Sequence, residues 1–192
     1  MTHSIQVERV KRLKGVAIFA ILVVVIHFTW KFTVTEDELN NRISWLGIDL
    51  TTIFEKAADT VTDQSAELLS VAGVEPERLS GNRLQFEHGR RLRVDWSCTG
   101  LKQAVVFTII VLVFPGRARH KLWYIPAGLM LIWAFNVVRI TAVAAFFSRN
   151  PESFDFLHEY LFKYLFYGLI FLLWLIWVEK FVPVTTQEST ER

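Results

Sequence analysis

The 192-residue chain is 52% hydrophobic, with 16 Phe, 7 Trp and a positive mean hydropathy. This composition is too apolar for a soluble domain of this size. The net charge of +2 does not indicate nucleic-acid binding, because the basic residues lie beside the apolar segments and form no single patch. A chain with one cysteine forms no intrachain disulfide, which excludes a dithiol redox enzyme. The composition therefore predicts a membrane protein.

Four apolar segments predict transmembrane helices, each of which must cross about 30 Å of hydrocarbon at about 1.5 Å per residue. The second segment is short, and it reaches this length only if its helix begins near Cys98 and runs to Pro115. A cleaved signal peptide is the alternative for the first segment, but the segment is long and lacks a small-x-small cleavage site. We expect an all-α multi-pass membrane protein with spans at about 15–33, 98–115, 122–147 and 160–182.

Charged residues next to the spans predict the orientation of the chain. Basic residues are frequent before the first span and in the turn between spans two and three, at Arg9, Lys11, Arg12, Lys14, Arg117, Arg119 and Lys121. The short turn before the fourth span holds only Arg149. The positive-inside rule then places the N-terminus (1–14) and the tail (183–192) in the cytoplasm, with a single membrane domain at 15–182. We expect a protein of the cytoplasmic (inner) membrane with an extracytoplasmic segment at 34–97.

The extracytoplasmic segment predicts an amphipathic helix followed by a short β-hairpin. Apolar residues recur at three- and four-residue steps from Leu46 to Val61, typical of a helix that lies on the membrane surface or on the bundle. From residue 84 to residue 96 apolar and polar residues alternate, and the step from His88 to Gly89 falls where a turn is needed. The second strand would lead directly into Cys98 at the outer membrane face.

Cys98 begins the motif CTGLK and is the first candidate for chemistry. A lone cysteine is most often an inert apolar filler. At a helix N-terminus, however, the free N–H groups and the macrodipole favour the thiolate, so we expect a lowered thiol pKa. Gly100 would let a substrate backbone come close. Lys102 lies on the same helix face and would either add to this effect or snorkel toward the membrane surface.

Arg139 and His158 are predicted to lie at the same membrane depth as Cys98. An arginine inside a span costs about 2.5 to 3.5 kcal/mol, so it is expected to face the protein interior; snorkelling is the alternative. Asn136 would hold the guanidinium or serve a helix–helix contact. His158 opens the fourth span, although a loop histidine is most often solvated. Thiol chemistry needs a base and a cation for the oxyanion, which these residues supply. His27 is interpreted as an interhelical hydrogen bonder.

CTGLK at 98–102, NVVRI at 136–140 and His158 resemble, in order and membrane placement, the three signature regions of the exosortase and archaeosortase family. The resemblance covers about 82–167 and implies a multi-pass membrane cysteine enzyme that acts as a protein-sorting transpeptidase. It implies Cys98 as the nucleophile, Arg139 as the substrate- or oxyanion-stabilising cation and His158 as the acid/base. The family motif usually reads Cys-Ser-Gly, and Thr99 keeps the hydroxyl. Many relatives carry more spans, so this chain resembles a short, catalytic-core member.

The resemblance further implies cleavage of secreted proteins beside a C-terminal transmembrane sorting signal, through a thioester on Cys98. The acceptor would be a membrane lipid, another carrier or water. No residue cluster has metal-ligand spacing and no glycine loop resembles a nucleotide cradle, so no metal or cofactor is expected. Two other hypotheses stay open, namely a non-catalytic membrane scaffold and a solute-transport component in which Arg139 contacts an anionic solute.

Overall fold

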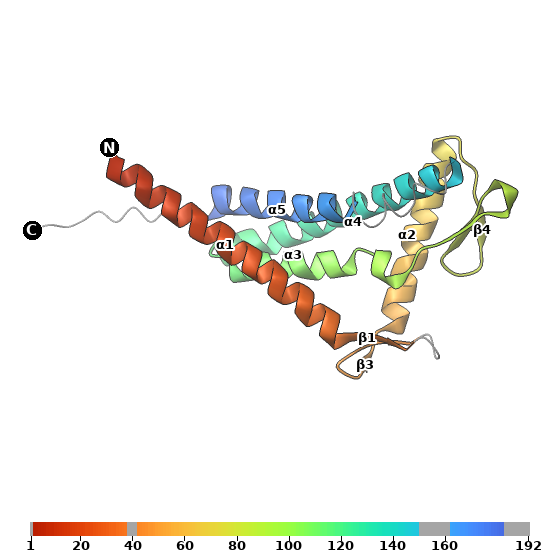
Figure 1. Cartoon of the computed structure of the whole chain (residues 1–192), viewed down its shortest axis with the longest axis horizontal. Helices are drawn as coiled ribbons and strands as arrows, with labels where there is room; N and C mark the ends of the chain where they lie inside the picture. Colours follow the sequence, from red (N-terminus) through yellow and green to blue (C-terminus); the bar gives the residue numbers. More distant parts are fainter. Residues whose placement is uncertain (1, 38–41, 150–161, 183–192) are drawn as a thin grey trace, which may run out of the picture.

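The computed structural model describes residues 2–37, 42–149 and 162–182. It is mostly helical and combines a helical bundle with two small antiparallel sheets (Figure 1). In chain order the elements are α1 (Thr2–Thr33), β1 (Val34–Asp37), β2 (Arg42–Trp45), β3 (Ile48–Asp49), α2 (Thr51–Val71), β4 (Glu77–Leu79), β5 (Arg83–Gln85), η1 (Glu87–Gly89), β6 (Arg91–Arg93), η2 (Trp96–Cys98), α3 (Leu101–Val113), α4 (Ala118–Arg149) and α5 (Phe162–Phe181).

Three helices of the described part are long and apolar enough to cross a membrane, and they are α1 from Leu13, α4 and α5. The predicted four-span count is not confirmed, because α3 has only 13 residues and measures about 20 Å at 1.5 Å per residue. The predicted helix from Cys98 to Pro115 is shorter at both ends. It begins at Leu101 after Gly100, whose φ of 80° is left-handed, and Phe114 before the proline is already extended.

The end of α3 is fixed to the helices that follow it. Lys121 donates hydrogen bonds from Nζ to the carbonyl oxygens of Leu112 and Phe114, at 2.7 and 2.8 Å. These carbonyls lack helical partners at a C-terminus, so the ammonium both satisfies and neutralises them. The ring N–H of Trp177 in α5 donates to the carbonyl oxygen of Pro115 at 3.1 Å. The α3–α4 turn is therefore held against α5.

The bundle core lies between α3, α4 and α5 and is built largely from aromatic and branched side chains. Phe107, Ile110, Trp174 and Trp177 are all buried there. The ring of Phe107 occupies the space that a Cβ at Gly128 would need. A small residue at this position lets α3 and α4 pack closely, as is common between membrane helices. This packing fixes the height of the start of α3 relative to α4.

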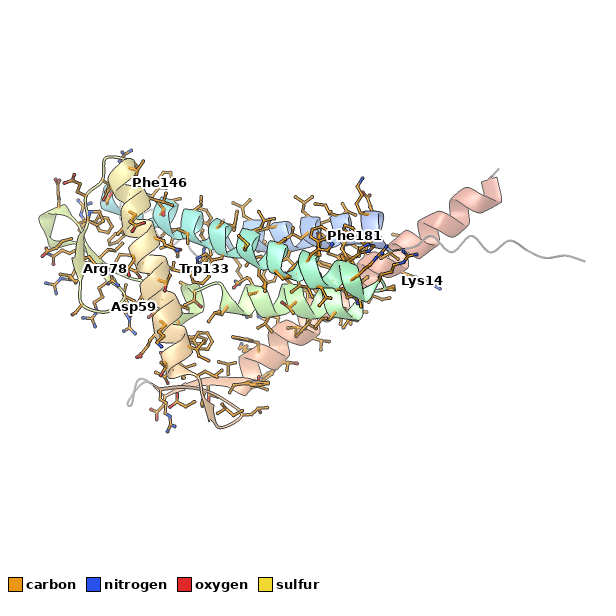
Figure 2. All side chains as sticks on the ribbon, turned by 180° about the vertical axis from the view of Figure 1, so that it is seen from behind. Lys14, Asp59, Arg78, Trp133, Phe146 and Phe181 are labelled. Atoms are coloured by element: carbon orange, nitrogen blue, oxygen red, sulfur yellow. The ribbon has the colours of Figure 1, made fainter. Side chains whose placement is uncertain are left out.

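Helix α2 lies across α4, so of the two predicted placements it adopts the one on the bundle. The ring N–H of Trp133 in α4 donates to the side-chain oxygen of Gln64 in α2 at 2.8 Å, and Figure 2 shows Trp133 beside this helix. The predicted helical pattern started at Leu46, but α2 begins at Thr51. Leu46 and Gly47 instead form a turn with positive φ between β2 and β3.

The predicted hairpin is present. Strands β5 and β6 pair antiparallel with Leu84 opposite Leu92, and η1 forms the connection. Leu84, Phe86, Leu92 and Val94 are buried, as their alternation predicted. The third strand of this sheet, β4, and the whole β1–β2–β3 sheet were not predicted. These strands are only two to four residues long, which gives too little alternation to recognise.

The two ends of the molecule differ in character. The N-terminal end of α1, the α3–α4 turn and the C-terminal end of α5 lie at one end, and α2 with both sheets lies at the other (Figure 1). Figure 2 shows Lys14 and Phe181 at the first end and Asp59 and Arg78 at the second. The segments predicted to be basic and cytoplasmic are thus grouped at one end, away from the predicted extracytoplasmic segment.

Candidate active site

Cys98 is the last residue of η2, a short 3₁₀ turn between the hairpin and α3. Its N–H donates to the carbonyl oxygen of Asp95 at 2.9 Å, and the hydroxyl of Thr99 donates to the carbonyl oxygen of Trp96 at 2.7 Å. These local bonds fix the turn that carries the thiol. The Cys98 side chain is 7% exposed, and it packs in a cluster with Val61, Val94 and Ile140, which come from α2, the hairpin and α4.

Arg139 lies in α4 and is buried, with 7% of its surface exposed. The guanidinium lies close enough to the Cys98 thiol to act on its charge, and it donates a hydrogen bond to the side-chain oxygen of Asn136 at 3.4 Å. The Asn136 amide donates in turn to the backbone carbonyl of Cys98 at 2.9 Å. The guanidinium carbon lies 5.8 Å from the centre of the Phe166 ring in α5, within cation–π range. Arg139 therefore faces the interior, as predicted, and does not snorkel.

The Cys98 thiol has a raised pKa, and the predicted lowering is wrong. Burial is the largest cause of the rise, and the Asp95 carboxylate adds to it. The Arg139 guanidinium and a hydrogen bond with Ser97 act in the opposite direction without overcoming burial. The prediction failed because α3 starts only at Leu101, so the thiol does not sit at a helix N-terminus and instead lies among apolar side chains. At neutral pH the thiol is protonated.

The structure explains the glycine at position 100 by its packing against Asn136, whereas its predicted role is to let a substrate backbone come close. It is buried, its φ is 80°, and a Cβ there would lie 3.1 Å from the side-chain carbon Cγ of Asn136. The absence of a side chain lets Asn136 reach the carbonyl of Cys98. Thr99 and Gly100 thus shape the turn, and Asn136 joins that turn to α4.

A cavity of about 700 Å³ opens next to Arg139, between α1, α3 and α5, and β1 and α2 also contribute to its lining. Arg139 and Ser97, which both act on the thiol, line this cavity. The other described lining residues are His27, Trp30, Lys31, Val34, Phe54, Trp96, Lys102, Gln103, Lys163, Tyr164, Phe166 and Tyr167. Cys98 is not among the described lining residues, so in this conformation the cavity reaches the guanidinium but not the sulfur.

Two histidines, His27 and His158, were considered as possible neighbours of Cys98 and Arg139. The ring Nδ1 of His27 in α1 lies 2.9 Å from the hydroxyl of Tyr167 in α5, which confirms the interhelical hydrogen bond, and both side chains line the cavity. His158, the predicted acid/base, falls in 150–161, outside the described residues. Its proximity to Cys98 stays a prediction. The structure therefore brings together two members of the predicted triad.

Lys102 lines the cavity and is not among the groups that act on the Cys98 thiol. Sequence reasoning considered this lysine but missed Lys31 and Lys163, which line the same cavity. Both lie at helix ends, in the last turn of α1 and the first turn of α5. Lysines at span ends ordinarily snorkel to the membrane surface, so only the arrangement of the helices identifies them as neighbours.

Comparison with known proteins identifies a family for most of the chain. The family model described as transmembrane exosortase (Exosortase_EpsH) matches residues 43–178. The matched region contains Cys98, Asn136 and Arg139 as well as the predicted His158, and it leaves out α1 with His27. No curated protein and no solved structure matches the chain.

The rate of Cys98 alkylation by a small thiol reagent is expected to rise with pH, with a midpoint above that of an ordinary exposed thiol. Burial causes this shift, and Arg139→Gln should raise the midpoint further because it removes the opposing positive charge, whereas Arg139→Lys should raise it less. A Cys98→Ala, Ser80→Cys variant supplies an exposed reference thiol in the same protein. A Cys98 midpoint below that of the reference would contradict the structure.

Gly100→Ala is expected to lower the thermal stability of the purified protein more than Gly81→Ala does. Both glycines have a left-handed φ, at 80° and 71°, which costs an L-residue about 1 to 2 kcal/mol. Only Gly100 has a close neighbour, Asn136, whereas nothing lies within 4 Å of a Cβ at Gly81. Equal losses in the two variants, measured by thermal unfolding in detergent, would show that the contact with Asn136 does not need the glycine.

Proposed function

This chain belongs to the transmembrane exosortase family, and on that premise we propose that it is a membrane cysteine peptidase and transpeptidase. Its substrates are secreted proteins, which it cleaves beside a C-terminal transmembrane sorting signal at the outer face of the cytoplasmic membrane. The observation that best supports this proposal is that the buried Arg139 guanidinium lies close enough to the Cys98 thiol to favour its ionised form. This supports the proposal because the thiol, which is the proposed nucleophile, then has a cation beside it, and that cation lines a cavity.

The reaction begins when the Cys98 sulfur attacks the scissile carbonyl carbon. The tetrahedral intermediate collapses with cleavage of the C–N bond, the leaving amine takes up a proton, and the acyl group stays on sulfur as a thioester. An acceptor nucleophile then attacks the thioester carbonyl, the C–S bond breaks and the thiol is restored. A membrane lipid or another carrier serves as the acceptor, with water as the competing nucleophile.

Arg139 stabilises the negative charge that develops in both steps. Its described contacts are the amide of Asn136, the thiol of Cys98 and the ring of Phe166, none of which carries a full negative charge at neutral pH. A buried cation without a carboxylate partner interacts strongly with a nearby oxyanion or thiolate because the surrounding dielectric constant is low. Asn136 forms hydrogen bonds with both Arg139 and the backbone carbonyl of Cys98. It thereby fixes the position of Cys98 relative to the guanidinium.

A base is needed because the resting thiol is protonated. His158 is proposed for this role on the strength of the family resemblance, and it would later donate the proton to the leaving amine. The thiol must also reach the substrate, although Cys98 does not line the cavity. A small change in the exposed neighbour Ser97, which lies at the cavity wall, would open the path to the sulfur.

Cys98→Ala and Arg139→Gln should each stop C-terminal processing of secreted proteins, the second by about 10² to 10³-fold because an oxyanion donor is lost. Arg139→Lys should recover part of the activity, because it keeps the charge. Intact-mass analysis of secreted and membrane proteins from cells that carry each variant measures the effect, and Ser80→Ala, at an exposed position outside the cavity lining, serves as the control. Continued processing by Cys98→Ala would rule out the nucleophile, and solute flux that survives this change would favour a transport component.

His158→Gln should lower processing by about 10² to 10⁴-fold, as expected for the loss of a general acid/base. His27→Gln should retain most activity, because an amide can still bond to the Tyr167 hydroxyl that His27 contacts. The same mass analysis compares the two variants at equal membrane expression. A severe loss with His27→Gln and a mild one with His158→Gln would transfer the acid/base role to the cavity histidine.

A further inference from the structure

Three lysines from three different helices line the cavity beside Arg139. Lys31 lies in the last turn of α1, Lys102 near the start of α3 and Lys163 in the first turn of α5. Lys31 and Lys163 are the charged groups that act on the ammonium of Lys102, and all three act on His27. The three positive charges therefore lie around the same cavity, although the residues are far apart in the sequence.

No carboxylate lines this cavity among the residues that the structure describes. The ion pairs found in the same residues involve Arg42, Arg78 and Arg93, which lie elsewhere. Like charges held together repel one another, and the repulsion grows as water is excluded. Arg139 adds a fourth positive charge at the wall. Within the described residues, no anionic side chain of the cavity balances these cations.

Gln103 provides a second, uncharged indication of a ligand. Its side chain lines the cavity, and its amide oxygen is buried without a hydrogen-bond partner in the described part of the chain. Buried polar groups without partners are rare in folded proteins. The amide can present either its oxygen or its NH₂ group to a ligand, depending on its orientation. A polar ligand in the cavity would supply the missing partner.

The number and type of the cations favour a phosphate group over a single carboxylate. Lysine ammonium groups are compact charges that bind phosphate from several directions, whereas a planar carboxylate is matched best by one arginine fork. A phosphate offers up to two negative charges and at least two free oxygens to share among three lysines. One carboxylate would leave most of the positive charge unbalanced.

The position of the cavity favours the headgroup level of a membrane. Lys31 and Lys163 lie at the ends of two candidate spans. Trp30, Tyr164 and Tyr167 surround them in the same lining, and tryptophan and tyrosine are enriched where membrane meets water. We propose that this cavity binds a phosphate-bearing anion, held by Lys31, Lys102 and Lys163, either a lipid headgroup or a soluble phosphate compound. The proposal does not depend on thiol chemistry.

The test uses the full-length Cys98→Ala protein in nanodiscs of phosphatidylcholine, so that no turnover can occur and a failure of the proposed peptidase activity cannot affect the result. One arm titrates radiolabelled pyrophosphate from solution, and the other adds phosphatidic acid to the disc and counts bound lipids by native mass spectrometry. Saturable binding of one ligand per chain is expected in at least one arm. The responding arm identifies the source of the phosphate.

Lys102→Gln combined with Lys163→Gln should weaken this binding by about a hundredfold, or about tenfold for each charge removed, since tenfold corresponds to about 1.4 kcal/mol. Lys56→Gln, on the exposed surface of α2, is the matched control and should bind normally. The double variant should also unfold at a higher temperature without ligand, because repulsion is relieved, yet gain no stability from pyrophosphate. This pattern separates a lost site from a misfolded protein.

Three outcomes would overturn the proposal. They are no saturable binding in either arm, equal affinity of the double variant and Lys56→Gln, and tighter binding of a tricarboxylate such as tricarballylate than of pyrophosphate. The last result would assign the cavity to carboxylate groups, such as those of an acidic peptide.

Discussion

The guanidinium of Arg139 holds the centre of this molecule together. It joins the helix that carries it, α4, to the turn that carries Cys98 and to the ring of Phe166 in α5. A charge at this depth is costly unless polar groups surround it, and here the partners are an amide, a thiol and an aromatic face. These neutral partners solvate the charge without cancelling it. The positive potential remains available at the cavity wall, where a catalytic or binding group can use it.

The shortness of α3 sets the depth of that site. A helix of 13 residues covers about 20 Å, which is about 10 Å less than the hydrocarbon thickness. Because the α3–α4 turn is held at the opposite end by Lys121 and Trp177, the start of α3 stays recessed among the longer helices. Helix α2 and the hairpin then cover the recess with Val61 and Val94. Burial keeps the thiol protonated, while the exclusion of water strengthens the field of Arg139.

Features with a strong local signal were predictable from the sequence, and features that depend on long-range packing were not. Long apolar segments gave α1, α4 and α5, alternation gave the hairpin around His88 and Gly89, and the cost of a charge in a span placed Arg139 in the interior. The start of α3 was misplaced because the left-handed φ of Gly100 leaves no trace in hydropathy. The predicted direction of the thiol pKa shift was wrong for the same reason, because it assumed that Cys98 begins the helix. Lys31 and Lys163 come together only in the folded bundle.

Arg139 links the thiol and the cavity, since it contacts the first and lines the second. One positive charge cannot fully stabilise both a thiolate and an anion in the cavity, so each must weaken the other, and this coupling is reciprocal. An anion bound in the cavity therefore disfavours ionisation of Cys98. A thioester is neutral, so it does not compete with that anion for the positive charge of the guanidinium. A phosphate-bearing acceptor would accordingly compete with the thiolate needed for acylation but not with the acyl-enzyme. On the proposed function, and with the proposed anion as acceptor, the shared cation would favour an order in which the thioester forms first and the anionic acceptor binds second.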